Sequence, residues 1–432
     1  MPQRYWVETL GCPKNQVDSD KLAGTLLADG MAPATSPEDA DLVVVNTCAF
    51  IEAAREESIE TVLSLAELRR PDARLVVTGC MAQRYGEELA EALPEVDLVA
   101  GFGVPVTLRA RPGDPPSFDL LNLPRPAAAA PWAYVKVAEG CDRACGFCAI
   151  PDFRGPQRSR EPSSILREIG ELGAKEVILV AQDLASYGRD VGRPGAIVDL
   201  VGAAAELVDR VRLLYLYPSS LTGALLDAIC ATGVAYFDLS LQHVSPPLMR
   251  RMRRWGNGER FLARIGDIRQ REPDAALRSS FIVGYPGETE EDHDALLAFL
   301  EEAELDWVGL FAFSREERTV AAGLPDQVPA GLVAERLAEC GELCDAITAR
   351  RRAELVGREM DVLVDSPGVA RSHREAPEID GIVQVPPALE VGGFERVVVT
   401  AAEGPDLLGA PVASARRPGA PVLRLARATR VA

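Results

Sequence analysis

Short apolar runs alternate with helical stretches over residues 1 to about 110, a pattern typical of a parallel sheet with crossover helices. Three of these runs predict strands: RYWVETL at residues 4–10, DLVVVNT at 41–47 and RLVVTG at 74–79. The N-terminal part of the chain is therefore predicted to be an α/β domain built on one parallel sheet.

A cysteine follows each of these strands, either directly or after one glycine: Cys12, Cys48 and Cys80. The C-terminal ends of strands in an open parallel sheet share one edge, where ligands bind. The three thiols are therefore expected to meet at one point and hold a ligand. Three separate core cysteines are the alternative, because a single cysteine is most often simply buried.

From Trp132 onward, six further β-like runs are separated by helical patterns such as residues 162–173 and 289–304. The runs are WAYVKVA, KEVILVAQ, VRLLYLY, YFDLSLQ, LRSSFIVG and DWVGLFAF. Repeated βα units either open into a doubly wound sheet or curl into a barrel, and six units predict a partial barrel. Polar and glycine residues cluster where a site at the C-terminal strand ends is expected: Gln182, Asp183, Gln242, His243 and Gly284 to Glu288.

Proline content and strand pattern divide the rest of the chain. Residues 111–131 contain six prolines and no hydrophobic periodicity, as in a linker. A long helix is predicted over residues 330–355, and the short β-like segments after it predict a small β-barrel. We therefore expect an N-terminal domain (1–115), a proline-rich linker (116–131), a barrel domain (132–357) and a C-terminal β-barrel (358–432).

Composition narrows the function classes. The chain is 47% hydrophobic and 26% charged, which is typical of a globular protein. No apolar run is long enough to cross a bilayer and no export signal is present, so we expect a cytoplasmic protein without a membrane partner. Nine cysteines in such a chain point to metal ligation or redox chemistry rather than disulfides.

Charge bears on the partner. The net charge of -19 disfavours a partner bound mainly through phosphates and favours a basic protein. The C-terminal module carries nine Lys or Arg against ten Asp or Glu, so it lacks the basic surface of an RNA-binding barrel. We do not expect direct RNA binding to dominate, although Arg154, Arg158 and Arg160 form a local basic cluster that is either a binding patch or structural.

The most informative stretch is GCDRACGFCAIP, which spaces Cys141, Cys145 and Cys148 as C-x-x-x-C-x-x-C after the first barrel strand. Three thiolates on one loop can each bind one iron of a cubane cluster and leave the fourth iron open. An open iron can chelate a small molecule and pass it one electron. Structural zinc is the alternative, but no fourth Cys or His lies close in the sequence.

This loop resembles the signature of the radical S-adenosylmethionine (SAM) superfamily, with Phe147 at its aromatic position. The resemblance implies a 4Fe-4S cluster that cleaves bound SAM to a deoxyadenosyl radical. It also implies a region that binds SAM, with Gln182 and Asp183 at the methionine end, Gln242 at the ribose, and Gly284, Gly287 and Glu288 beside the adenine. Each of these residues has a structural alternative as a turn or capping residue.

Further segments resemble the methylthiotransferases: GCPKNQVDSD at 11–20, NTCAFIEAAREESI at 46–59, TGC at 78–80 and the tail from Arg358, which is similar to their TRAM barrel. The resemblance implies a second 4Fe-4S cluster held by Cys12, Cys48 and Cys80. GCPKN, AIPDFRGPQRSR and REAPEIDG are similar to the RimO branch.

That branch implies conversion of an aspartate in the twelfth small-subunit ribosomal protein to β-methylthioaspartate, with an electron donor and a sulfur source as further partners. Modification of a transfer RNA adenosine and a non-catalytic metal-stabilised binding scaffold are the alternatives. Cys230, Cys340 and Cys344 are expected to be core residues.

Overall fold

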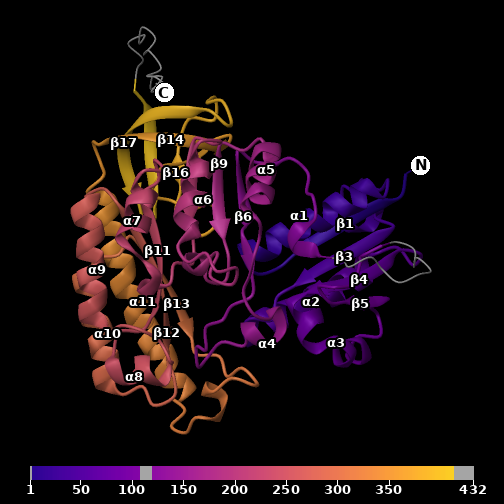
Figure 1. The fold of residues 1–432 in the computed structure, drawn as a ribbon, viewed down its shortest axis with the longest axis horizontal. Coiled ribbons are helices and arrows are strands. Elements are labelled where there is room, and N and C mark those ends of the chain that lie inside the picture. The colour runs from indigo at the N-terminus through magenta and orange to yellow at the C-terminus, as the bar shows by residue number, and fades with distance from the viewer. Residues whose placement is uncertain (1, 108–118, 413–432) are drawn as a thin grey trace, which may run out of the picture.

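Five parallel strands form the N-terminal sheet in the computed structural model, which describes residues 2–107 and 119–412 (Figure 1). The sheet order is β2-β1-β3-β4-β5. The strands are β1 (Arg4–Thr9), β2 (Ala32–Pro33), β3 (Leu42–Thr47), β4 (Arg74–Gly79) and β5 (Leu98–Ala100). The three strands predicted from sequence are thus β1, β3 and β4. Residues 108–115 of the predicted domain, 116–118 of the predicted linker and 413–432 of the predicted C-terminal barrel lie outside the described residues.

Helices cover both faces of this sheet, which explains why its central strand β3 is buried at every position. Helix α1 (Pro13–Ala28) packs Leu22 and Leu26 on one face. Helices α2 (Glu52–Leu68) and α3 (Cys80–Ala92) pack on the other face through Val62, Leu65 and Leu89. The C-terminal strand edge therefore lies where α1, α2 and α3 begin.

Six parallel strands build the central domain as a partial barrel, as the sequence predicts. Two three-stranded sheets, β10-β9-β6 and β11-β12-β13, are joined by a parallel bridge between Leu216 and Leu239. The strands are β6 (Trp132–Lys136), β9 (Glu176–Val180), β10 (Arg210–Leu213), β11 (Tyr236–Gln242), β12 (Ala276–Val283) and β13 (Trp307–Ala312). A small hairpin of β7 (Ala138–Glu139) and β8 (Arg158–Ser159) follows β6.

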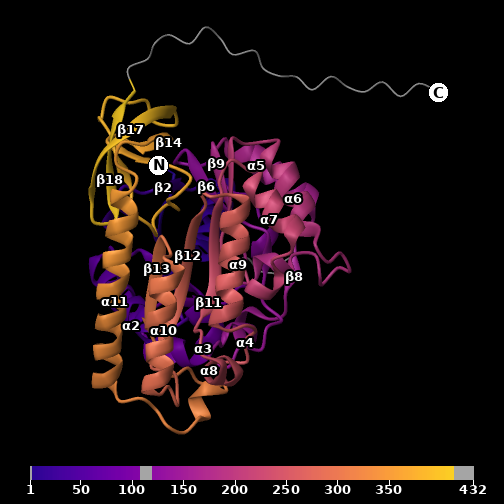
Figure 2. The same cartoon turned by 90° about the vertical axis from the view of Figure 1, so that its left-hand side faces the viewer.

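Most helices of this domain cover the outside of the barrel (Figure 2). The helices are α5 (Pro162–Leu172), α6 (Ala196–Ala205), α7 (Gly223–Cys230), α8 (Pro246–Arg251), α9 (Gly258–Arg271), α10 (Glu290–Ala303) and α11 (Ala330–Ala353). The short helix α4 (Ile150–Arg154) instead packs against α3 of the N-terminal domain. Local sequence explains their limits: Thr289 and Asp292 form a capping box at the start of α10, and Gly173 ends α5 in the left-handed conformation.

Helix α1 joins the two domains. It lies between β1 and β6 in Figure 1, and Val17 packs with Tyr134, Ile178 and Leu214 of the barrel. Lys14 also places its ammonium 3.4 Å from the centre of the Tyr215 ring, just after β10. The start of α1, where Cys12 lies, is thereby held against the C-terminal side of the barrel.

The C-terminal module is a closed barrel with the order β14-β15-β16-β18-β17. Its strands are β14 (Glu359–Ser366), β15 (Val369–Arg371), β16 (Val383–Gln384), β17 (Phe394–Glu403) and β18 (Asp406–Pro411). The segment between β15 and β16 packs against the opposite end of the central barrel, where Trp307 Nε1 donates to Arg374 O at 2.7 Å and Tyr134 Oη donates to Pro377 O at 2.9 Å. This contact leaves the C-terminal strand ends of the central barrel facing the N-terminal domain.

Candidate active site

Cys12, Cys48 and Cys80 lie together at the C-terminal edge of the N-terminal sheet. A Cβ atom added to Gly11 would lie 2.8 Å from Cys48 Sγ. Burial raises the pKa of the Cys48 thiol to about 12, and the neighbouring Cys12 and Cys80 add to this shift. The structure therefore brings the three predicted residues into one group of thiols, in which Cys48 and Cys80 are buried and Cys12 is half-buried.

Backbone geometry beside each cysteine fixes this group. Gly79 has φ of +92°, and a Cβ there would lie 2.6 Å from Thr47 O, so only glycine allows β4 to approach β3 this closely. Asn15 Nδ2 donates to Leu10 O at 2.9 Å and to Thr47 O at 3.1 Å, which ties the ends of β1 and β3 to α1. Helix N-termini favour thiolates, and Cys12 caps α1 while Cys80 is the first residue of α3.

Positive charges surround these thiols. Although burial opposes it, the charges of Lys14 and Arg154 lower the pKa of Cys12. Burial raises the pKa of Cys80, although Arg154 Nη2 lies 3.0 Å from Cys80 Sγ. A metal cluster would supply the positive charge needed to hold all three groups as thiolates.

The second triplet occupies the loop between the β7 strand and helix α4. Cys141 N donates to Gly155 O at 3.1 Å, and Gly146 N donates to Met252 O at 2.9 Å. Gly140 has φ of +76°, and a Cβ there would lie only 2.1 Å from Pro156 O. The loop that carries Cys141, Cys145 and Cys148 is therefore held by backbone contacts on both sides.

A cationic and an aromatic side chain lie close to the cysteines of this loop. Arg254 Nη1 lies 3.3 Å from Cys145 Sγ, and Phe147 packs against the cluster of apolar side chains that includes Met252 and Tyr285. Burial raises the pKa of Cys141 to about 11 and that of Cys148 to about 12. As for Cys48 and Cys80, a bound metal would favour the thiolate forms.

Neither triplet has the spacing of a single-ion site. Within residues 2–107 and 119–412, no three His, Cys, Asp or Glu side chains are arranged to hold one metal ion. Thiolates on separate irons of a cubane stand farther apart than the ligands of one zinc ion. The three thiols of each group match in number the three protein ligands of a cubane cluster with one open iron.

Gln182 and Asp183 lie at the C-terminal end of β9, beside the cysteine loop. Gln182 Nε2 donates to Glu139 Oε1 at 2.8 Å, and Arg143 Nε donates to Asp183 Oδ2 at 2.6 Å. The amide oxygen of Gln182 (Oε1) and the other carboxylate oxygen of Asp183 (Oδ1) are buried and make no hydrogen bond to the described residues. Two buried acceptors at this position suit an amino group of a ligand.

The other predicted SAM residues lie at the ends of β11 and β12. Gln242 has φ of +76° at an irregularity in the pairing of β11 with β12, which directs its half-buried side chain away from the regular strand pattern. Glu288 Oε2 accepts hydrogen bonds from Gly284 N at 2.7 Å and Tyr285 N at 3.2 Å. Gly287 and Glu288 line a cavity of about 360 Å³ that none of the cysteines borders.

The sequence did not point to Glu139 or Arg143. Glu139 Oε2 pairs with Lys136 at 2.6 Å, and its Oε1 accepts from Arg154 at 2.7 Å. Arg143 lies inside the cysteine loop, and its guanidinium stacks 3.9 Å from the centre of the Tyr217 ring. Their positions could have identified them, because Glu139 lies just before the cysteine signature and Arg143 lies inside it.

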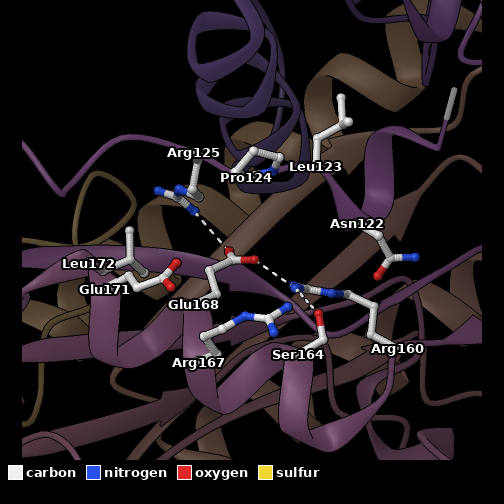
Figure 3. Close-up of a pocket in the computed structure, with 10 residues that line it drawn as sticks. All are labelled: Asn122, Leu123, Pro124, Arg125, Arg160, Ser164, Arg167, Glu168, Glu171 and Leu172. Atoms are coloured by element: carbon white, nitrogen blue, oxygen red, sulfur yellow. Dashed lines mark hydrogen bonds and ion pairs between the residues drawn. The ribbon is translucent and has the colours of Figure 1, made fainter. Parts of the chain in front are cut away.

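The predicted basic cluster is mostly structural. Arg154 and Arg160 are 9% and 4% exposed, whereas the Arg158 side chain is 56% exposed. Figure 3 shows Arg160 beside a pocket of about 140 Å³, where it pairs with Glu168 at 2.7 Å. This pocket lies between α5 and residues 122–125 and contains no cysteine, so it is separate from both triplets.

The remaining cysteines lie away from the site. Cys340 and Cys344 are buried in the hydrophobic core of the central domain, and the half-buried Cys230 packs against the same core, as expected from sequence. Among residues 2–107 and 119–412, no helix combines the length and the apolar composition that a bilayer crossing requires.

Comparisons with known proteins agree with this arrangement. Residues 4–101 match the uncharacterized protein family UPF0004, residues 135–300 match the radical SAM superfamily and residues 356–412 match the TRAM domain. The ribosomal protein uS12 methylthiotransferase RimO of Saccharopolyspora erythraea is 41% identical, and the match covers 96% of each chain. The chain belongs to the RimO family.

Two further RimO proteins, from Kineococcus radiotolerans and a Nocardioides species, are each 39% identical over 94% of this chain and cover 97% and 96% of those relatives. The chain is therefore a radical SAM methylthiotransferase, as the resemblance of its cysteine motifs predicted. Membership of the radical SAM superfamily brings with it SAM and one 4Fe-4S cluster.

Proposed function

We propose that this chain converts an aspartate of ribosomal protein uS12 to β-methylthioaspartate, using two 4Fe-4S clusters and SAM. The observation that carries the proposal is a contact between the helix after the SAM loop and the cysteine triplet of the other domain. Arg154, on the helix that follows the SAM loop, reaches Cys80 of the other triplet at 3.0 Å. A radical generated at one triplet and a sulfur group held at the other could then act on one substrate carbon.

Cys141, Cys145 and Cys148 would hold the cluster that binds SAM. Three ligands leave one iron open, and Gln182 Oε1 and Asp183 Oδ1 supply buried acceptors for the amino group beside it. Arg143 holds Asp183 in place through the 2.6 Å contact. Gln242 would contact the ribose, while Gly284, Gly287 and Glu288 would shape the adenine side and Phe147 would pack beneath the loop.

Cys12, Cys48 and Cys80 would hold the second cluster. The burial of Cys48 and Cys80 would limit the access of water to a sulfur-donating site, and the cations Lys14 and Arg154 would offset the negative charge of three thiolates. When bound, the clusters and SAM supply the radical that removes hydrogen from the aspartate β-carbon and the methylthio group that replaces it. The protein groups named here act by holding these reactants and excluding solvent.

We assign the domain limits by the cluster or the fold that each segment would carry. Residues 1–115 would form the domain of the second cluster, 116–131 the linker, 132–357 the radical SAM domain and 358–432 the TRAM-like barrel. The described part of the linker is packed between domains, since Arg125 donates to Asp20 of α1 and to Tyr134 O of β6. The linker would therefore help to hold the two cluster sites face to face.

The substrate is inferred from the relatives and from charge. The three RimO proteins named above are described as acting on uS12. Ribosomal proteins are typically basic, and this chain has a net charge of -19, which favours such a partner. An electron donor and a sulfur source would complete the reaction, and a cytoplasmic location would give access to the substrate.

The test is anaerobic incubation of the reconstituted protein with SAM, dithionite, sulfide and purified uS12, followed by peptide mass spectrometry. A methylthio group on one aspartate of uS12 is the expected product. A matched reaction with the Cys12→Ala/Cys48→Ala/Cys80→Ala variant should still consume SAM but leave uS12 unmodified. Modification of transfer RNA in place of uS12 would overturn the substrate assignment.

A further inference from the structure

The side chain of Arg154 crosses from the central domain into the N-terminal domain. It belongs to α4, directly after the SAM loop, and is 9% exposed. Its Nη2 lies 3.0 Å from Cys80 Sγ and donates to Asn15 Oδ1 at 2.7 Å. One guanidinium nitrogen therefore contacts both a ligand candidate and the residue that ties β1, β3 and α1 together.

The other side of the same guanidinium is held by the central domain. Arg154 Nη1 donates to Glu139 Oε1 at 2.7 Å, and Gln182 Nε2 donates to that oxygen at 2.8 Å. A continuous path of hydrogen bonds thus runs from Gln182 through Glu139 and Arg154 to Cys80. It joins the strand end that faces the SAM cluster to a cysteine of the second triplet.

The geometry requires arginine rather than any cation. Its planar fork presents several donors in fixed directions, whereas lysine is a point charge on a flexible stem. Arg154 uses this fork on Cys80, Asn15 and Glu139 at once. Its Nη1 and Nη2 also each lie 3.4 Å from Asp18 Oδ2. The face of the guanidinium also lies 4.6 Å from the centre of the Phe102 ring, which fixes its plane.

A donor at a cluster thiolate has a definite electronic effect. One-electron reduction makes a cluster more negative, and a hydrogen bond or a positive charge at a ligand sulfur stabilises that reduced state. The reduction potential of the cluster is therefore higher when the donor is present. Burial strengthens this effect, because little water is available to screen the charge.

We propose that Arg154 is a positioning residue that holds the Cys80 side of the second cluster against the SAM loop and raises the reduction potential of that cluster. The inference rests on the proposed function, because it requires a cluster at Cys12, Cys48 and Cys80. A purely structural role, as an ion pair between domains, would instead leave the potential of the cluster unchanged.

The test uses the full chain with Cys141→Ala/Cys145→Ala/Cys148→Ala, so that only the second cluster can form. Arg154→Met and Arg154→Lys are made in this background, and each protein is reconstituted with iron and sulfide and titrated with dithionite under EPR detection. Arg158→Met is the matched control, because Arg158 is on the same segment but its side chain is 56% exposed and pairs with Asp119 at the surface.

We expect Arg154→Met to shift the midpoint potential downward and to change the EPR g-values, while Arg158→Met changes neither. Arg154→Lys should fall between them, because it keeps the charge but not the three simultaneous contacts. If Arg154→Met does not retain iron, the lysine variant decides through the same two measurements.

An Arg154→Lys protein with the parent potential and spectrum would overturn the inference, as would an Arg154→Met protein that keeps iron and shows neither change. Failure of the background protein itself to bind iron is a different result. It would remove the second cluster, and with it the proposed function, before Arg154 is examined.

Discussion

Replacing Gly140 with alanine tests whether the SAM loop depends on a backbone that only glycine can supply. Gly140 has φ of +76°, where a side chain costs ~1 kcal/mol. The added Cβ would also lie 2.1 Å from Pro156 O and 2.5 Å from Gly155 O, and neither backbone atom can rotate away. Overpacking of this kind costs a further ~1–3 kcal/mol, so the native conformation of the loop should be destabilised by ~2–4 kcal/mol in total.

A loop displaced by this clash cannot align three cysteines on one cluster. After anaerobic reconstitution, Gly140→Ala is therefore expected to hold about four irons per chain where the parent protein holds about eight. The triplet of the N-terminal domain should keep its cluster. Gly173→Ala is the matched control: Gly173 also has positive φ (+67°), but no atom lies within 4 Å of its added Cβ. The control should lose ~1 kcal/mol in the free energy of unfolding and no iron. Equal iron content in Gly140→Ala and the parent protein would refute the reasoning.

Two other predictions concern contacts between domains. Glu316 is 2% exposed and pairs with Arg55 at 2.5 Å and with Arg84 at 2.7 Å. Glu316→Ala should therefore destabilise the contact between the N-terminal and central domains by ~3 kcal/mol. Unchanged protease sensitivity of the 313–329 segment would contradict this prediction. Burial opposes ionisation of Glu176, but Arg371 and Arg212 lower its pKa to about 2. Because this pKa lies below the usual value of 4.5, the ionised Glu176 carboxylate stabilises the folded protein above about pH 4.5. This contribution, ~3 kcal/mol in the free energy of unfolding, is lost as the pH falls toward about 2. In urea unfolding, Glu176→Gln should be less stable than the parent near neutral pH and show a flatter acid limb; parallel pH profiles would rule this out.

The repeating elements could be read from the sequence because their signals are local. Residues 42–45 and 177–180 are continuous apolar runs within buried strands, and the helical period of residues 289–304 places Leu296, Phe299 and Leu300 on the buried face. The cysteines could be assigned to one edge because parallel strands share the direction of their C-terminal ends. This rule brought together residues separated by more than thirty positions.

Short strands and contacts between domains could not be predicted in this way. The two-residue strands β2, β7, β8 and β16 are too short to show a period, and they exist because a neighbouring strand supplies hydrogen bonds. The role of Arg154 depends on Cys80, which is 74 positions away in another domain. The sequence offered only a cluster of arginines, and the contacts that each one makes depend on the packing of the two domains.

The same limit applies to the segment REAPEIDG at residues 374–381. Its sequence is similar to the RimO branch but does not indicate where the segment lies, and the structure packs it into the end of the central barrel through Arg374, Pro377 and Asp380. Burial raises the pKa of Asp380 to about 6, although Arg278 and a hydrogen bond from Tyr236 oppose the shift. The packing of this segment depends on side chains from three separate strands, so no local sequence pattern could predict it.

The central claim is that two sets of three cysteines each hold a 4Fe-4S cluster, and the most direct measurement is iron and sulfide content after anaerobic reconstitution. We predict about eight irons per parent chain and about four in the Cys12→Ala/Cys48→Ala/Cys80→Ala variant, with matching sulfide. An unchanged iron content in that variant, or one zinc per triplet in the parent protein, would contradict the account.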